Sequence, residues 1–475
     1  MRHRLFIDDD WLEPVDGAYF PTIDPATEEP IAEIARGGAG DMDRAVRAAD
    51  AAMKGPWSRL APAERGALLF KLADAIAGQR EELARLETLD VGKPLKDSLG
   101  DIDGVVTTLR YNAGAADKMQ GETIPLGPDV VDFTLLEPLG VTAHIVPWNF
   151  PLGMAMRSLA PALAAVCTAV LKPAEQSPLS ALKFAELLPA AGIPKGVVNV
   201  VTGFGEEAGE ALVRHPLVRG ISFTGSVETG RKILAGAAPG IKPAVLELGG
   251  KNPMIVFADA DLERAVGDAL AGSFENCGQV CSSSSRYLLE SAIREDFLGL
   301  LGEKAAKLSV GPGIENSDIG PIVSKDQYER VTGYVARGQA EGARLRLGGS
   351  RPRHLQRGYF IEPTIFDGAA PSAAIAREEI FGPVGIALDI AGEEQAVELA
   401  NGLGYGLAAG IYTQDISRAL RLARQIQAGS IWINGWWMGG VQAPTGGMKD
   451  SGIGRERGLA GIRNYLQIKN VAIRI

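Results

Sequence analysis

The chain has 475 residues, of which 46% are hydrophobic and 22% charged, a composition typical of two or three folded domains and not of a disordered protein. Its formal net charge is −10 and its pI about 5.2, so its overall field repels phosphate backbones and anionic membrane surfaces. We therefore expect neither nucleic acid nor a membrane as a partner.

Three features stand out along the first third of the chain. The opening "MRHRLFIDDDWLEP" meets three aspartates before any apolar segment, which predicts neither a signal peptide nor a transit peptide. Residues 62–89 carry apolar side chains at helical spacing between Pro62 and the sequence "GKP", and predict one long amphipathic helix. Residues 124–138, "IPLGPDVVDFTLLEP", have two apolar runs around a Gly-Pro turn and predict a β-hairpin.

Short continuous apolar runs then alternate with helical segments. The predicted strands are 141–146, 168–172, 197–203, 221–225, 245–250 and 253–257, with helices that include 179–188 and 206–213. A second series has strands at 285–290, 382–390 and 409–413 and helices at 393–403 and 415–426. This alternation predicts parallel sheets buried on both faces, and hence two α/β domains in succession. The final run, "YLQIKNVAIRI", alternates and predicts a strand. The most apolar span, "SLAPALAAVCTAVLKP", contains Pro161 and is too short for a membrane helix.

The chain contains only Cys167, Cys277 and Cys281, which indicates a reducing compartment, and we expect a cytoplasmic protein. The last two lie four residues apart in "FENCGQVCSSSS". A zinc site would need further ligands, but the four histidines lie at positions 3, 144, 215 and 354, so no metal is expected. A disulfide between the pair would be unusual in the cytoplasm. From these residues alone, two buried cysteines and one reactive thiol both stay open.

The motifs along the chain resemble those of the aldehyde dehydrogenase superfamily. "FENCGQVC" fits that family's F-x-N-x-G-Q-x-C pattern. "PWNFP" (147–151), "KPAE" (172–175), "FTGSVETG" (223–230), "LELGGKNP" (246–253), "EEIFGPV" (378–384) and "GGMKDSGIGRERG" (446–458) occur in the family's order. Agreement at seven places over nearly the whole chain makes chance negligible. The resemblance implies that Cys281 is a nucleophile and that Cys277, at a variable position, only packs.

The chemistry of aldehyde oxidation suits the matched residues. A carbonyl carbon gives up hydride readily only after a nucleophile has added, and a thiolate is well suited to that addition. By resemblance, Cys281 attacks, the Asn149 side-chain amide and the Cys281 backbone N–H stabilise the resulting oxyanion, and Glu247 is the general base. Taken singly, Asn149 could be a turn residue and Glu247 a residue at the end of a surface strand.

The predicted cofactor is NAD. The glycines in "VVNVVTGFGEEAG" are spaced one residue longer than the usual dinucleotide fingerprint and are weak evidence by themselves. The resemblance instead implies that the pyrophosphate lies at the helix N-terminus opened by Gly225 and Ser226. It assigns the adenosine ribose to Lys172 and Glu175 and the nicotinamide end to Glu379 and Phe381, with Trp148 also matching the family pattern.

The substrate pocket is predicted from the same resemblance. Arg157, eight residues after Asn149, corresponds to a tunnel position where semialdehyde dehydrogenases bind a distal carboxylate. The position of their usual second arginine holds Glu275 instead, so the two side chains could simply neutralise each other. Thr445, in "PTGG", replaces a common tunnel aromatic, whereas two neighbouring tryptophans would suit a planar ring. The candidate pocket residues are Phe150, Arg157, Glu275, Trp436, Trp437 and Thr445.

The resemblance implies a Rossmann-type NAD-binding domain (1–116 and 138–247), an α/β catalytic domain (248–445) and a small β bridging element (117–137 and 446–475), in a homodimer or homotetramer. The leading function is NAD-dependent oxidation of an aldehyde to the acid, with an aromatic or bulky substrate favoured over a carboxyl-bearing semialdehyde. A CoA-acylating enzyme is the alternative within enzymes, although Glu247 speaks against it. A non-catalytic structural or binding homologue is the alternative from another class.

Overall fold

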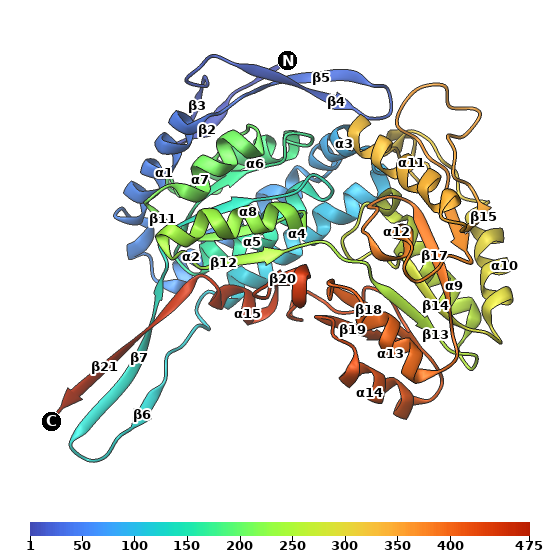
Figure 1. Ribbon diagram of the computed structural model, residues 1–475. Coiled ribbons are helices and arrows are strands. Elements are labelled where there is room, and N and C mark those ends of the chain that lie inside the picture. The colour runs from blue at the N-terminus through green and yellow to red at the C-terminus, as the bar shows by residue number, and fades with distance from the viewer.

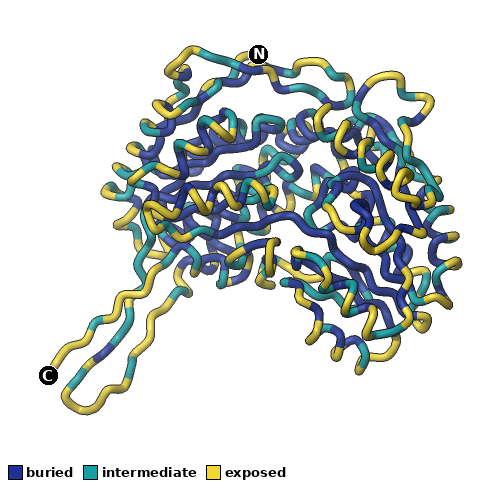
Figure 2. Tube along the Cα trace, viewed as in Figure 1, coloured by how far each residue is buried: buried dark blue, intermediate teal, exposed yellow.

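The computed structural model describes all 475 residues and has two α/β lobes with a narrow β arm projecting from the first (Figure 1). No helix in it combines the length and apolar character that crossing a membrane requires. The apolar runs of the sequence become the strands of two large sheets, which lie inside a shell of half-exposed helices (Figure 2).

The first lobe is built on an eight-stranded sheet. Its order is β20 (Gly452–Ile453), β12 (Ala244–Glu247), β11 (Val218–Thr224), β8 (Val141–Ile145), β9 (Thr168–Lys172), β10 (Val198–Val200), β2 (Leu5–Ile7) and β3 (Asp10–Leu12). The five strands from β12 to β10 are parallel, as predicted, and the outer strands on each side are antiparallel. The predicted parallel sheet is therefore confirmed at the centre of this lobe.

Helices cover both faces of this sheet. One face is covered by α1 (Ala39–Met53), α7 (Glu210–Arg214) and α8 (Val227–Ala237), and the other by α5 (Pro151–Ala164) and α6 (Leu179–Ala190), with α2 (Pro62–Gly78), α3 (Arg80–Val91) and α4 (Leu95–Ala115) outside them. Successive strand residues alternate between the two cores: Val170 packs on the first face and Leu171 on the second. Burial on both faces explains why these strands read as continuous apolar runs.

Two predicted helices differ from the structure. Residues 62–89 form two helices, because the backbone leaves the helical region at Gln79 (φ −114°, ψ 20°) directly after Gly78. Glycine is a poor helix former, and the apolar spacing continues across the break, which is why the pattern reads as one helix. The segment predicted at 206–213 begins as a π-helical turn, Gly205–Gly209, before α7.

The second lobe is built on a seven-stranded sheet. Its order is β15 (Arg344–Leu347), β16 (Thr364–Asp367), β17 (Val384–Ile390), β14 (Arg286–Glu290), β13 (Pro253–Val256), β18 (Ala408–Tyr412) and β19 (Ser430–Ile433), parallel except for β15. Its helices are α9 (Leu262–Phe274), α10 (Arg294–Ala305), α11 (Lys325–Ala340), α12 (Ala374–Arg377), α13 (Glu393–Asn401) and α14 (Ile416–Gln425). The second predicted α/β series is confirmed.

The arm is a three-stranded antiparallel sheet in the order β21 (Leu466–Arg474), β7 (Val130–Pro138) and β6 (Thr123–Pro125), which confirms the predicted hairpin and the final strand. The segment 446–475, which was predicted to belong to this arm, is divided between the arm and the first lobe. Its strand β20 pairs with β12 in the first lobe, and α15 (Gly458–Arg463) packs on α5. A small sheet of β1 (Arg2–His3), β5 (Glu29–Ala35) and β4 (Tyr19–Asp24) was not predicted.

Candidate active site

The loop that carries Cys281 follows α9 through a tight turn. Asn276 and Cys277 have left-handed φ values of 46° and 57°. Gly278 has φ 68°, and a Cβ there would lie 2.2 Å from the Gly382 carbonyl oxygen, so only glycine fits. The turn leaves Cys277 in the core, 1% exposed, while Cys281 is half-buried at the cavity wall. Adjacent turns thus separate two cysteines that the sequence places close together.

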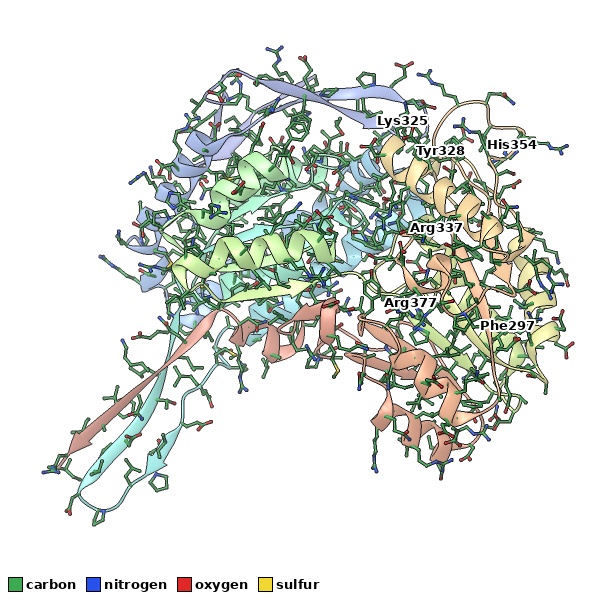
Figure 3. All side chains as sticks on the ribbon, viewed as in Figure 1. Phe297, Lys325, Tyr328, Arg337, His354 and Arg377 are labelled. Atoms are coloured by element: carbon green, nitrogen blue, oxygen red, sulfur yellow. The ribbon has the colours of Figure 1, made fainter.

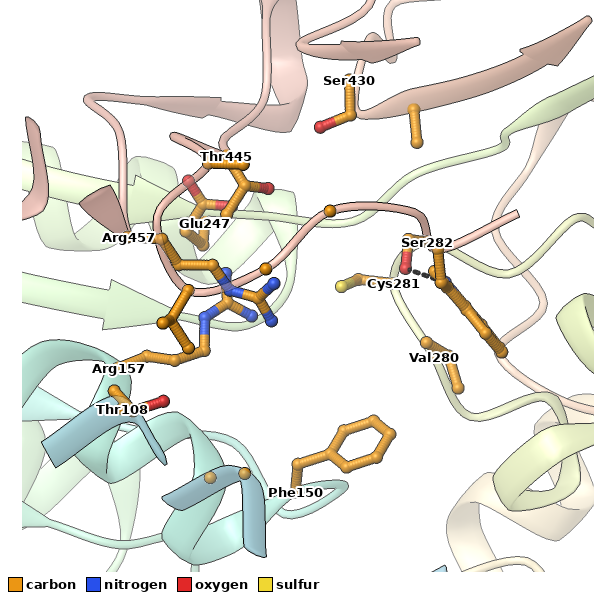
Figure 4. Close-up of a pocket in the computed structure, with 18 of the residues that line it drawn as sticks. Thr108, Phe150, Arg157, Glu247, Val280, Cys281, Ser282, Ser430, Thr445 and Arg457 are labelled. Carbon is orange, nitrogen blue, oxygen red and sulfur yellow. Dashed lines mark hydrogen bonds between the residues drawn. The ribbon is translucent and has the colours of Figure 1, made fainter. Parts of the chain in front are cut away.

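Cys281 faces a cavity of about 790 Å³ that both lobes line. Figure 4 shows its sulphur across the cavity from the side chains of Arg157, Glu247 and Arg457, with Phe150 on a third side. Burial raises the pKa of the Cys281 thiol to about 11, and the positive charge of Arg157 acts in the opposite direction. The thiol is therefore accessible to a small molecule but protonated in the isolated site near neutral pH.

Asn149 is held at the start of α5, next to the cysteine loop. The side-chain Nδ2 of Asn149 donates to the Gln279 backbone carbonyl oxygen at 2.8 Å. The backbone carbonyl oxygen of Asn149 accepts from Asn276 Nδ2 at 3.0 Å. Lys93 Nζ lies 3.5 Å from the same carbonyl. The Asn149 side chain is 4% exposed, so these contacts fix the amide beside the loop of Cys281. Since a primary amide has two N–H groups, one stays available for a second acceptor.

Glu247 ends β12 and is 6% exposed, with no hydrogen-bond partner on Oε1. Burial, reinforced by the negative charge of Glu456, raises the pKa of Glu247 to about 8. A Cβ at Gly446 would lie 2.7 Å from this Oε1, so the glycine keeps space open in front of the carboxyl. Glu247 is thus a buried, unpartnered acid whose pKa lies close to the pH at which a general base operates.

The structure pairs Arg157 with Glu456 and not with Glu275. Arg157 Nη2 lies 2.7 Å from Glu456 Oε2, with side-chain exposures of 14% and 5%. The prediction that Arg157 and Glu275 neutralise each other is therefore wrong, because Glu456 on the loop before α15 is the nearer carboxylate. Glu275 also lines the cavity, and burial, helped by Asp97 and Asp101, raises its pKa to about 7.

The residues predicted for the phosphate and ribose end of the cofactor gather at the carboxyl ends of β9 and β11. Lys172 Nζ lies 3.0 Å from Glu175 Oε2. Ser226 caps α8 by accepting from the Thr229 amide at 3.2 Å. A Cβ at Gly225 would lie 2.5 Å from the Phe223 ring, so the turn requires glycine. The first amides of α8 stay free to face an anion.

The residues predicted for the other end of the cofactor lie where the lobes meet. Glu379 Oε1 accepts from the Gly250 amide at 3.0 Å, and burial raises the pKa of Glu379 to about 7. The rings of Trp148 and Phe381 pack edge to face, with centroids 5.3 Å apart. Phe381 has a left-handed φ of 61°, an uncommon conformation for this residue type.

Histidines play no part in this site. His354, for example, lies at the outer edge of the second lobe (Figure 3). No group of three or more His, Cys, Asp or Glu side chains is placed to hold a metal ion. The polar groups described at the site are the Cys281 thiol, the carboxyls, the Asn149 amide and the guanidinium groups.

Comparison with known proteins decides the family. The model of the "Aldehyde dehydrogenase family" matches residues 11–471. The chain belongs to the aldehyde dehydrogenase family. The "Hydroxyisobutyraldehyde dehydrogenase" of Mycolicibacterium austroafricanum is 46% identical over 474 residues, covering 99% of this chain and 94% of that protein. The "Betaine aldehyde dehydrogenase, chloroplastic" of Beta vulgaris is 41% identical over 478 residues, covering 98% and 95%.

A solved structure from this family also resembles this chain closely. The NAD⁺ complex of the aldehyde dehydrogenase from Bacillus cereus has a TM-score of 0.98 and 44% sequence identity, and the match covers 100% of this chain and 97% of that one. The predicted fold class, an aldehyde-dehydrogenase-like α/β architecture, is confirmed by this similarity.

Five of the six predicted pocket residues of this aldehyde dehydrogenase family member line the cavity: Phe150, Arg157, Glu275, Trp437 and Thr445. Trp436 does not. It is 8% exposed, belongs to the core of the second lobe and donates its indole N–H to the Ser282 carbonyl at 3.2 Å. Trp437 has a left-handed φ of 52°, lines the cavity, and donates its indole N–H to Ser282 Oγ at 2.8 Å.

Among the cavity residues that the sequence did not predict are Trp432 on β19 and Arg457. Trp432 lies in an apolar run and reads as a core residue. Arg457 lies in "GRERG", within one of the motifs that match the family, and this position in a matched motif was the available signal.

Proposed function

We propose that this family member oxidises an aldehyde to the carboxylic acid with NAD as hydride acceptor and Cys281 as nucleophile. The observation that carries the proposal is that the Cys281 thiol and the unpartnered carboxyl of Glu247 line one cavity. The overall reaction consumes the aldehyde, water and NAD⁺ and yields the acid, NADH and a proton.

Cys281, Asn149 and Glu247 have separate roles in this reaction. The Cys281 sulphur adds to the aldehyde carbon, its proton leaves through Glu247 or solvent, and the carbonyl oxygen becomes an anion that the Asn149 amide can stabilise. NAD, when bound, supplies the hydride acceptor. The acyl group is then a thioester on Cys281. Glu247 takes a proton from the water that attacks this thioester, and the acid leaves.

The fit of the residues to NAD supports the cofactor assignment. Gly225 and the free amides of α8 form a cradle that suits a pyrophosphate. The Glu175 carboxylate lies at the end of β9, where it can accept from ribose hydroxyls and would repel a 2′-phosphate. The aldehyde dehydrogenase of Bacillus cereus, 44% identical, is an NAD⁺ complex.

A water-dependent reaction is favoured over transfer of the acyl group to CoA. Glu247 has no hydrogen-bond partner on Oε1 and a pKa of about 8, which are the properties of a base that activates water. A purely structural role is disfavoured because such a role would not explain an unpartnered carboxyl beside a half-buried thiol.

The cavity favours a bulky aldehyde, and an aromatic one fits well. Its volume of about 790 Å³ exceeds what a two- or three-carbon aldehyde fills, and Phe150, Trp432 and Trp437 line it. The relatives are named for different aldehydes, betaine aldehyde and hydroxyisobutyraldehyde, so their names do not decide the substrate of this chain.

We also propose that the arm joins copies of the chain in a homodimer or homotetramer. Val131 and Leu135 on β7 and Ile468 on β21 are exposed apolar residues, and contact between subunits would cover them. The division into NAD-binding, catalytic and bridging parts follows the two sheets and the arm, with β20 assigned to the first lobe. The three free cysteines suit the cytoplasm.

The test of the catalytic assignment compares two cysteine variants. Cys281→Ser should abolish NADH formation while leaving NAD binding nearly intact, because a serine hydroxyl supplies no comparable nucleophile at neutral pH. Cys277→Ser is the matched control and should keep most of the activity. Equal losses in the two variants at equal thermal stability would contradict a single nucleophile.

A further inference from the structure

Arg457 is a charged side chain in the catalytic cavity without a partner in the protein. It lines the same cavity as Cys281 and Glu247, and it forms neither an ion pair nor a side-chain hydrogen bond. The one other arginine or lysine of the cavity lining, Arg157, is paired with Glu456. In Figure 4 the guanidinium groups of Arg157 and Arg457 lie together and point into the cavity on the side facing the Cys281 sulphur.

The backbone holds Arg457 in this position from both sides. Glu456 and Thr445 exchange backbone hydrogen bonds of 2.7 and 2.9 Å, and the Gly458 amide donates to the Val441 carbonyl at 2.8 Å. Arg457 itself has φ 60° and ψ 171°, a region that residues with a Cβ rarely occupy. The side chain is therefore directed into the cavity by a fixed loop, at a conformational cost that a surface arginine would not need.

The charge of Arg457 is not cancelled nearby. Glu456 is already neutralised by Arg157, and Glu247 is largely protonated near neutral pH because its pKa is about 8. Two other acids line the cavity. Asp101 shares Lys93 with the buried Glu87, at 2.5 and 2.9 Å from Nζ, and Glu275 has a pKa raised to about 7 by burial. The groups whose charges act most strongly on Arg457 are instead Arg157, Glu456, Cys281 and Glu247. The end of the cavity at Arg457 thus has a net positive charge.

We propose that Arg457 determines substrate specificity and that it selects aldehydes carrying a carboxylate, which its guanidinium binds. A planar guanidinium can bind a carboxylate through two parallel N–H···O hydrogen bonds. Because folding already places the Arg457 guanidinium in the cavity wall, part of the cost of removing it from water is met before the substrate binds. The inference rests on the proposed aldehyde oxidation. In this proposal the substrate carboxylate is bound by Arg457, which has no partner, and not by Arg157, which is paired with Glu456.

The test uses aldehydes that differ only in charge. Succinic semialdehyde is compared with its methyl ester, and 4-formylbenzoate with methyl 4-formylbenzoate, by kcat/KM at saturating NAD. The wild type should prefer the anion of each pair. Arg457→Leu should lower the anion-to-ester ratio about 30-fold, the effect of losing a charged hydrogen-bonding partner. Arg457→Lys should recover part of the ratio because it keeps the charge but not the bidentate geometry.

Arg85→Leu is the matched control. Arg85 is exposed on α3 and has no ion pair, so its loss should leave the ratio as in the wild type. The proposal is overturned if the wild type prefers the esters or an aminoaldehyde such as 4-aminobutanal. It is also overturned if Arg457→Leu lowers kcat/KM for anion and ester by the same factor, since Arg457 would then act on the reacting centre or on folding.

A binding measurement separates this inference from the proposed function. Glutarate, which has two carboxylates and no aldehyde, is titrated calorimetrically into the wild type, Arg457→Leu and Arg85→Leu. Weakened binding in Arg457→Leu alone supports a carboxylate site at Arg457 even if no aldehyde is oxidised, a result that would reject only the proposed function. Equal affinity in all three proteins, together with normal oxidation of neutral aldehydes, rejects the role of Arg457 and leaves the proposed function standing.

Discussion

Breaking the buried pair of Arg157 and Glu456 should destabilise the fold far more than it affects the choice of substrate. Removing one partner of a buried ion pair leaves an uncompensated charge and typically costs ~3–5 kcal/mol. With unfolding entropy of about 2.1 cal/mol/K per residue, a 475-residue cooperative unit changes by roughly 1 kcal/mol per degree. Arg157→Met or Glu456→Gln alone should therefore lower Tm by about 3–5 °C.

The double variant provides the internal control. Arg157→Met with Glu456→Gln removes both charges and leaves two neutral side chains of similar size, so its Tm should lie above that of either single variant. Differential scanning calorimetry at one fixed scan rate measures all four proteins. Additive losses in the double variant, or single losses below about 1 °C, would refute the reasoning.

The same variants should also move the pH dependence of activity in opposite directions. The negative charge of Glu456 raises the pKa of Glu247, and the positive charge of Arg157 lowers it. Glu456→Gln should therefore shift the rise of kcat/KM to lower pH, and Arg157→Met should shift it to higher pH. Because Arg157 is engaged with Glu456, Arg157→Met should change kcat/KM for benzaldehyde, succinic semialdehyde and propanal by similar factors.

Three further outcomes are expected. In the wild type, kcat/KM should rise as pH increases through about 8, because Glu247 must lose its proton to act as a base; a profile flat from pH 6 to pH 9 would contradict this role. NAD should be preferred over NADP, and Glu175→Gln should narrow the preference measured as the ratio of kcat/KM values. Gly225→Ala should weaken NAD binding in a fluorescence titration, because its Cβ would lie 2.5 Å from the Phe223 ring; unchanged affinity would remove the turn from the cofactor site.

The strands could be predicted from the sequence because sheets buried on both faces require continuous apolar runs. The break at Gln79 could not, since the apolar residues keep their helical spacing across it. Without the family resemblance, the residues alone did not distinguish a reactive Cys281 from a packing one. What separates it from Cys277 is a left-handed turn, and single-sequence periodicity does not report such turns.

Side-chain direction was the least predictable feature of the site. Trp436 and Trp437 are neighbours of one residue type, yet Trp436 belongs to the core and Trp437 lines the cavity. Arg457 reads as a surface charge in a segment rich in glycine and arginine. Its place in the cavity wall arises only when Glu456 pairs with Thr445, a residue on a separate loop.

The pairing of β7 with β21 has a consequence for synthesis on the ribosome. The register joins Pro138 to Leu466, so β7 must wait for 466 − 138 = 328 more residues before its partner exists. At translation rates of ~5–20 residues per second the wait is roughly 15–65 seconds. During that time only the three-residue strand β6 covers one edge of a nine-residue strand that carries Val131 and Leu135. Nascent chains of this protein should therefore depend on chaperones that shield the open edge of β7. The folded protein does not show this need, because β21 covers that edge.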